Sequence, residues 1–382
     1  MLSGMSFLAH QGRERIEVMQ STLEAIAKDQ PDWRVGASVF LPRYSPATSQ
    51  RYANTLDEHA LYVIGDPETR KMHAPYASRG RGRTQQAYLS EENFRVTKAR
   101  FVQAVLDAQV ANGRTVLISP WLVHGVTGSS RELDLTIDFA TRANGSPQVR
   151  GRTLLFGIEA TDHIFADDDG RADMLDRLVE LPERPFYMRM MVGGQPNRLG
   201  FANSAALEGL RTVVQSLAEN DRPVFLPQAG LAGWLMLPFG ALAFGAGISS
   251  SLQRCTTPEP GGGGGGQPPL PWYFAPSVLG FVLASELDDL RDVEGWEECD
   301  CPFCEGSPPN PRNFNAEAAG QHFLWWCAAL ANETHAARSA IASVRSRLRD
   351  ASQFWRAAQA AGVTLDDRSQ PKHLAAWTQA VR

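Results

Sequence analysis

Three cysteines lie close together in the run Cys-Asp-Cys-Pro-Phe-Cys, at Cys299, Cys301 and Cys304. The whole chain holds only five cysteines, and the other two, Cys255 and Cys327, stand apart. Zinc prefers four thiolate or imidazole ligands in a tetrahedron, and short spacings bring thiolates to one point without straining the backbone. The motif therefore predicts a structural zinc site.

Two histidines on the helical stretch that follows could complete the site. We expect His335 to be the fourth ligand and keep His322 as the alternative. A disulfide with a spare thiol is the other interpretation of the motif. It is disfavoured because no signal peptide is recognised and the cysteine content is low for a secreted scaffold.

Polar residues at the ends of predicted strands are the second group that could do chemistry. In a parallel barrel, side chains at the carboxyl ends of the strands point into the functional mouth. Asp66 and Glu159 are the predicted acid and base, and Arg189 and Gln228 are predicted to bind substrate. The alternative interpretation leaves them as loop residues that face solvent, with Asp66 in an ordinary Asp-Pro turn.

Short apolar runs that alternate with amphipathic stretches are typical of parallel strands joined by crossover helices. Eight strands are predicted, at residues 34–41, 60–65, 115–120, 153–159, 185–192, 223–228, 241–247 and 273–283. Helices are predicted at residues 90–112, 131–143, 171–181, 204–219 and 231–239, and then at 316–332 and 333–361.

This pattern predicts an α/β fold, a (β/α)8 TIM-type barrel with a C-terminal zinc-binding helical appendage. We place the barrel at residues 1–290 and the zinc-binding helical subdomain at 291–382. The stretch 256–271 contains six consecutive glycines flanked by prolines, which predicts a flexible surface loop. Its glycines lack the placement of a phosphate-binding motif.

The formal net charge of −5 excludes a general electrostatic attraction of the whole chain to nucleic acid. Two local basic patches remain: Arg79, Arg81 and Arg83, and a helical row of Arg338, Arg345, Arg347, Arg349 and Arg356. Each could equally be a solvated surface. The apolar run 229–248 is interrupted by Pro238 and several glycines, so we expect buried core, no membrane span and a cytoplasmic protein.

A barrel followed by Cys-x-Cys-x-x-Cys and a helical histidine resembles the tRNA-guanine transglycosylases, which include the queuine and archaeosine enzymes. The resemblance extends over about residues 60–351. Residues 132–143 resemble a helix after the base-recognition strand, and 186–194 resemble the glycine-bearing strand that lines the base pocket. The resemblance therefore implies that Gly193 and Gly194 contact substrate.

The chain departs from that family at its acids. The strand that bears the family's nucleophilic aspartate resembles residues 240–245, and the aligned position is Gly245. A second aspartate, which reads the purine edge, would fall near Pro120 or Trp121 and is missing. Only Asp66 matches a family acid, the general base.

Three functions follow from these observations. The first is a divergent transglycosylase-like enzyme that acts on a nucleobase or nucleoside in tRNA or DNA and uses Asp66 and Glu159. The second is a non-catalytic protein of the same fold that binds nucleic acid or pairs with an active subunit. The predicted protein partner is a second copy of the chain or a different subunit. The third is an unrelated zinc-stapled barrel enzyme with a small-molecule substrate.

Overall fold

A computed structural model describes residues 4, 6–12, 15–72, 97–126, 130–193, 201–248, 255, 272–304 and 315–382. Gly194, the glycine-rich stretch 256–271 and the basic patch at Arg79, Arg81 and Arg83 lie outside the described residues. The predictions made for those segments stay predictions.

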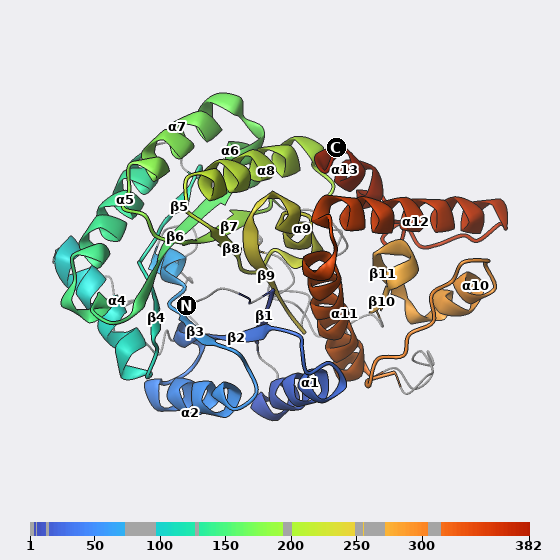
Figure 1. Cartoon of the computed structure of the whole chain (residues 1–382), viewed down its shortest axis with the longest axis horizontal. Helices are drawn as coiled ribbons and strands as arrows, with labels where there is room; N and C mark the ends of the chain where they lie inside the picture. Colours follow the sequence, from blue (N-terminus) through green and yellow to red (C-terminus); the bar gives the residue numbers. More distant parts are fainter. Residues whose placement is uncertain are drawn as a thin grey trace.

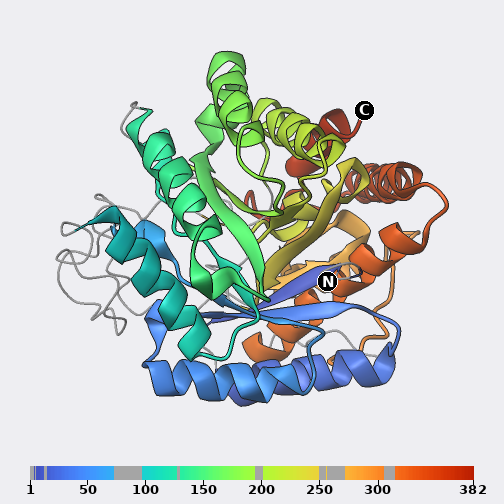
Figure 2. The same cartoon turned by 60° about the vertical axis from the view of Figure 1, so that its left-hand side comes forward.

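A parallel sheet forms the centre of the molecule, with helices around its outer face (Figure 1, Figure 2). Its strands follow the order β3-β2-β1-β9-β8-β7-β6-β4, and β5 pairs with β6. In chain order they are β1 (Phe7–Gln11), β2 (Val35–Phe40), β3 (Val63–Asp66), β4 (Val116–Ile118), β5 (Val123–His124), β6 (Thr153–Thr161), β7 (Phe186–Met191), β8 (Val224–Leu226) and β9 (Ala241–Gly247).

The sheet is strongly curled, because its first strand lies between the second and the last. Phe7 is in register with Val35 of β2 on one side and with Phe244 of β9 on the other. The two strands at the ends of the order, β3 and β4, come within 8 Å of each other at their Cα atoms. No ladder of hydrogen bonds pairs them in the described part of the chain. The predicted parallel α/β sheet is confirmed, and a closed barrel is not shown.

Helices follow the strands and cover the outer face of the sheet. They are α1 (Ile16–Asp29), α2 (Pro46–Asp57), α4 (Lys98–Ala111), α5 (Arg131–Asn144), α6 (Asp162–Ala166), α7 (Asp168–Val179), α8 (Ser204–Glu219) and α9 (Gly230–Trp234). Polar N-caps start several of them: the Asn203 side chain accepts from the Ala206 N–H, and Ser45 precedes Pro46 at the first turn of α2.

Apolar side chains pack on both faces of the strands, as expected for a buried parallel sheet. Phe7 belongs to the large cluster between the sheet and the helices, whereas the next residue, Leu8, belongs to a second cluster with Ile64 and Tyr187. Successive side chains of a strand point to opposite faces, so the second cluster fills the inside of the curl.

The region after the sheet begins with an antiparallel hairpin, β10 (Trp272–Ala275) and β11 (Gly280–Leu283), which is separate from the sheet. The single strand predicted at 273–283 is therefore wrong, and two strands of the sheet, β1 and the short β5, were missed. The remaining helices are α10 (Leu287–Arg291), α11 (Ala316–Ala336), α12 (Ala340–Ala360) and α13 (His373–Ala380).

Helix α11 runs against the start of the chain (Figure 1). The Gln321 amide donates to the hydroxyl of Thr22 in α1 at 3.0 Å, and the Trp325 indole donates to Asp29 at 2.9 Å. Helix α13 is held to the sheet region by the Trp377 indole, which donates to the Phe201 carbonyl at 2.9 Å. None of the described helices combines the length and the apolar character that crossing a bilayer requires.

Candidate metal centre and a buried charged cluster

Four side chains meet at one buried point in the C-terminal region: Cys299, Cys301, Cys304 and His322. Their ligand atoms all lie within 4.8 Å of one another. The Nδ1 atom of His322 is 3.3 Å from the Sγ of Cys299, 3.4 Å from that of Cys301 and 3.3 Å from that of Cys304. The cluster therefore has the three sulfurs arranged around one imidazole nitrogen.

This geometry is suited to a tetrahedral metal ion. Bond lengths of about 2.3 Å to sulfur and about 2.0 Å to nitrogen separate two ligand atoms of a tetrahedron by roughly 3.5 Å. The sulfur–nitrogen distances are close to that value. A buried set of three thiols and one imidazole could hold a metal ion.

The fourth member of the cluster is His322, so the prediction of His335 as the fourth ligand is wrong. Both histidines lie on α11, but thirteen residues of helix separate them by about 20 Å. His335 is exposed near the end of the helix. The Cys299–Cys304 turn packs beside the first half of α11, where only His322 can reach the sulfurs.

Neighbouring groups orient the ligands of this cluster. The other ring nitrogen of His322, Nε2, lies 2.8 Å from the carbonyl oxygen of Phe274, to which it donates when Nδ1 binds a metal. The Tyr273 ring stacks on the imidazole at 4.2 Å, and the Trp326 indole donates to the Sγ of Cys299 at 3.4 Å. Such partners fix the tautomer and the ring plane that a ligand needs.

A second buried group lies at the carboxyl ends of the sheet strands. Asp66 ends β3, and it forms an ion pair with Arg189 of β7. The Tyr187 hydroxyl donates to the same carboxylate at 2.7 Å. All three side chains are buried.

Glu159 of β6 lies on the other side of Arg189, whose Nη1 is 3.9 Å from the Glu159 Oε2. Donors surround this carboxylate: the Trp121 indole at 2.9 Å, the Arg70 Nη1 at 3.0 Å and the Cys255 thiol at 3.2 Å. The guanidinium of Arg189 thus joins the two carboxylates that the sequence predicts as a catalytic pair.

The surroundings push the pKa values of the two carboxylates in opposite directions. Burial raises the pKa of Asp66, and the charge of Arg189 offsets only part of that effect. Burial also opposes ionisation of Glu159, but Arg70 and Arg189 outweigh it and hold its pKa below the ordinary value. A carboxyl group with a raised pKa beside one with a lowered pKa is the arrangement of general acid–base pairs.

Gln228, two residues after β8, is held in a strained backbone conformation near this cluster. Its φ is +52°, which is rare for a residue with a side chain. Its backbone N–H donates to the Nε2 of His10 at 2.9 Å, and its carbonyl accepts from the Cys255 N–H at 2.9 Å. The Gln228 side-chain oxygen is buried and has no hydrogen-bond partner within the described residues.

His10 of β1 is neutral in this arrangement. Its Nε2 accepts from Gln228, so its Nδ1 carries the hydrogen and donates to the hydroxyl of Ser38. Burial and the charges of Arg189 and Arg43 keep its pKa well below the ordinary value.

The imidazole of His10 fills the space beside Gly245. A Cβ atom at position 245 would lie 2.3 Å from the His10 Nε2 and 3.0 Å from the Leu8 carbonyl oxygen. No side chain fits at position 245 while His10 holds its place. The neighbouring strand β1, which carries His10, therefore requires a glycine at this position.

The structure thus gathers Asp66, Glu159, Arg189 and Gln228 at one end of the sheet, while their roles stay predictions. Gly193 lies just after β7, and a Cβ atom added to it would be 3.8 Å from the Asp162 carboxylate. Its predicted contact with substrate stays a prediction. Arg70, Trp121, Tyr187, Cys255 and His10 belong to the same group and were missed. Tyr187 could have been found, because it lies two residues before Arg189 and shares its face of the strand.

The fold and the sites define a curled parallel α/β protein with a Cys3His cluster and a buried charged cluster at the strand ends. Compared with known proteins, the chain matches no family model and no curated relative. The resemblance to the transglycosylases therefore rests on the residues named above.

Proposed function

We propose that the strand ends bind a nucleobase or nucleoside unit of tRNA or DNA, and that Asp66 and Glu159 act on its N-glycosidic bond as in a divergent transglycosylase. One observation carries the proposal: the Arg189 guanidinium contacts both carboxylates, whose pKa values are shifted in opposite directions. The Cys-x-Cys-x-x-Cys motif supports the kinship.

In this proposal Asp66 is the acid, because burial raises its pKa while that of Glu159 is lowered. It gives a proton to the base as the bond from base nitrogen to sugar carbon breaks, and the bonding electrons leave with the base. The ionised Glu159 stabilises the positive charge that develops on the sugar. An incoming base or water then bonds to the sugar carbon and returns a proton to Asp66.

Gln228 and Arg189 supply recognition in the same proposal. A buried amide oxygen without a partner suits an N–H of a base, since leaving it unpaired costs about 1–3 kcal/mol. His10 acts through the backbone N–H of Gln228 and is therefore a positioning residue. We further propose that the ion of the Cys3His cluster is zinc, and that the sheet closes between β3 and β4 into a barrel.

Incorporation of labelled guanine into an RNA hairpin and its DNA counterpart tests the activity. Asp66→Asn and Glu159→Gln are each expected to lower the rate by roughly a hundredfold or more, the usual effect of losing a general acid or base. Asp162→Asn, next to the same strand end, is the matched control and should keep the rate. Unchanged incorporation in the Asp66 and Glu159 variants, with wild-type melting and metal content, would refute the catalytic assignment.

The environment of Gly245 favours a second candidate, a non-catalytic binding or accessory protein. The His10 ring excludes a carboxylate from that position, and the Cys255 thiol is a poor replacement nucleophile because burial raises its pKa to about 12. Under this candidate the wild-type chain retains RNA or DNA in mobility shifts, or co-purifies with a partner subunit, and exchanges no base. Exchange by the chain alone would exclude it.

A further inference from the structure

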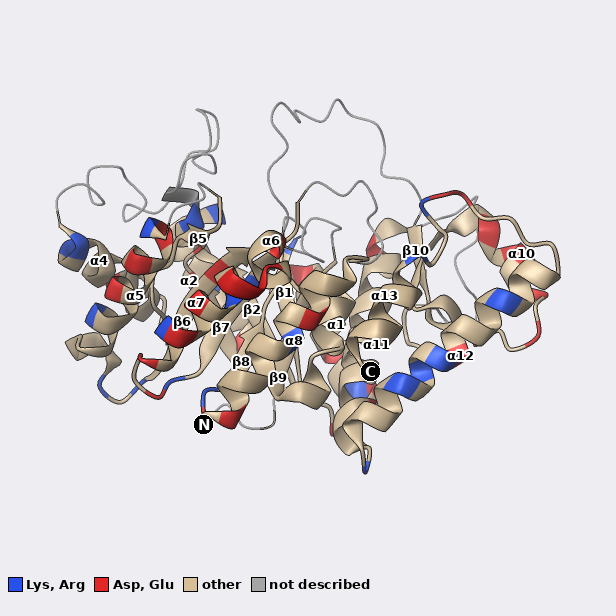
Figure 3. Cartoon of the chain, turned by 90° about the horizontal axis from the view of Figure 1, so that it is seen from above, with Lys and Arg blue, Asp and Glu red and all other residues tan. Residues whose placement is uncertain are grey.

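Helix α12 carries a row of arginines along one face. Arg345, Arg349 and Arg356 follow one another at steps of four and seven residues, with Ser352 between them, so their side chains share one side of the helix. Figure 3 shows the succession of Lys and Arg positions along α12. Eleven residues of helix extend this row over about 16 Å.

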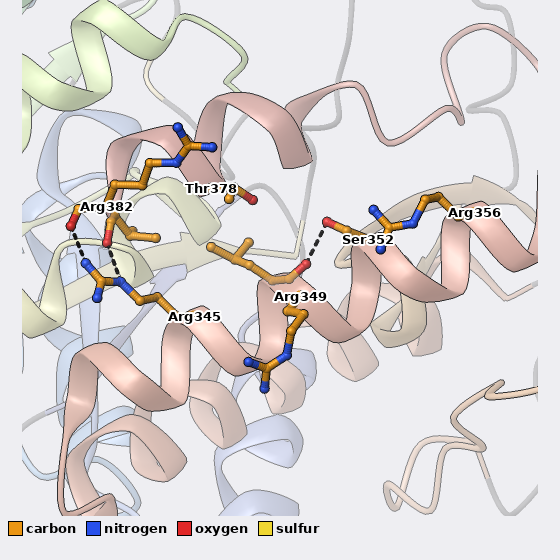
Figure 4. Close-up of a pocket in the computed structure, with 8 residues that line it drawn as sticks. Arg345, Arg349, Ser352, Arg356, Thr378 and Arg382 are labelled. Atoms are coloured by element: carbon orange, nitrogen blue, oxygen red, sulfur yellow. Dashed lines mark hydrogen bonds between the residues drawn. The ribbon is translucent and has the colours of Figure 1, made fainter.

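This face borders a cavity of about 360 Å³ between α12 and the end of the chain at α13. Arg382 and the hydroxyl-bearing Thr378 line its other side (Figure 4). Arg345 holds the two elements together, because its Nε donates to the Val381 carbonyl at 2.7 Å and its Nη2 donates to the Arg382 carbonyl. No carboxylate side chain lines the cavity.

Much of the positive charge of this face is not neutralised. Neither the Arg356 nor the Arg382 side chain has a hydrogen bond or ion pair with any described residue. Arg349 donates to Ser346 and is 3.8 Å from the exposed Asp350, a weak surface contact. In contrast, Arg347 on another side of α12 is held by Glu297 at 3.0 Å and by Glu333 at 2.8 Å.

We propose that this face of α12, with Arg382, binds the phosphate backbone of a nucleic acid. Guanidinium groups form paired hydrogen bonds with phosphate. The hydroxyls of Ser352 and Thr378 donate to the carbonyls of Leu348 and Leu374 at 2.7 and 2.8 Å, so the arginines carry the contact. The row is about 16 Å long, which is more than a small anion could contact and suits the succession of phosphates along a nucleic-acid strand. The choice of a nucleic acid rests on the proposed function.

The salt dependence of binding to a labelled RNA hairpin tests this proposal. Each arginine that contacts a phosphate releases counterions, so Arg349→Gln combined with Arg356→Gln should lower the slope of log K against log salt by about 2. Arg347→Gln removes the same charge from the same helix and should keep the slope, because Glu297 and Glu333 already neutralise that arginine.

An unchanged slope in the double variant, or an equal fall in the Arg347 variant, would overturn the proposal. Binding of inorganic pyrophosphate without binding of the hairpin would also overturn it, and would assign the cavity to a small anion. Failure here is distinguishable from failure of the proposed function. Asp66→Asn should leave the slope unchanged, whereas the double variant should lower it whether or not the chain exchanges a base.

Discussion

His10 occupies the space that a side chain at position 245 would need. Gly245→Ala places a Cβ against a ring that hydrogen bonds hold on both sides, so the ring cannot move freely. We expect the free energy of unfolding to fall by about 1–3 kcal/mol, the usual cost of overpacking. Urea denaturation measures it.

Gly145→Ala is the control for that variant, because position 145 has a negative φ and no atom within 3.6 Å of the added Cβ. It should leave the stability within a few tenths of a kcal/mol. If the His10 ring causes the shortage of space, Gly245→Ala should lower the free energy of unfolding less in a His10→Ala chain than in the wild type. A Gly245→Ala chain as stable as the wild type would contradict the steric argument.

His373 makes stability depend on pH. It is buried, its Nε2 donates to the Leu279 carbonyl at 3.0 Å, and burial lowers its pKa to about 4 from the ordinary 6.5. The unfolded chain therefore binds a proton that the folded chain refuses, so stability falls as pH drops from 6.5 towards 4. The fall from this residue amounts to about 3 kcal/mol.

Comparison of the wild type with His373→Gln isolates this effect, since glutamine can keep the hydrogen bond but does not titrate. We expect the free energy of unfolding, measured in urea, to decline less in the variant between pH 7 and 5. Parallel curves for the two proteins would show that His373 is protonated in the folded state as easily as in the unfolded one.

At the level of single residues, the sequence could place Asp66, Glu159, Arg189 and Gln228 together because each stands at or near the end of a predicted strand. That rule places side chains at one end of the sheet but does not predict which residues contact them. Arg70 and Cys255 reach Glu159 from segments outside the strands, across 89 and 96 residues. Such contacts depend on the three-dimensional course of the chain.

At the level of elements, helix α11 decides which histidine joins the cysteines. His322→Ala should abolish stoichiometric metal content, whereas His335→Ala should retain it, because only the first lies within 3.4 Å of the sulfurs. Metal analysis of both purified variants measures this. Loss of metal from the His335 variant alone would show that the cluster is assembled differently.

Elements with a strong apolar period were predictable and those with mixed character were not. The prediction of a helix at 204–219 coincides with α8, whose apolar residues recur on one face. Strand β1 was missed because its five residues, Phe-Leu-Ala-His-Gln, include two buried polar side chains. Spacing alone also could not choose between His322 and His335, since both lie on one helix.

At the level of the whole molecule, the cysteine cluster joins parts of the chain that are far apart. Its turn contacts α11, and α11 contacts α1 across 299 residues. Removal of metal should therefore lower stability by about 3 kcal/mol or more, equivalent to a melting temperature lower by roughly 4 °C for a chain of 382 residues. Calorimetry with and without a chelator measures it.

Hydrogen exchange after chelation should show which elements lose stability when the metal is removed. We expect faster exchange in β10, β11 and α11, where the ligands and their partners lie, with smaller changes in α5 and α7. Readdition of zinc should restore the original rates. A chelated chain with unchanged melting and exchange would exclude a structural role for the ion.

The position of β1 between β2 and β9 has a consequence for how the chain matures. Strand β1 leaves the ribosome before β9, so the edge that pairs with β9 stays open until β9 follows, and His10 meets Gln228 only across 218 residues. Pairings of such long range make folding slow. An N-terminal truncation before residue 15 would leave β2 and β9 with bare edges, ready templates for aggregation.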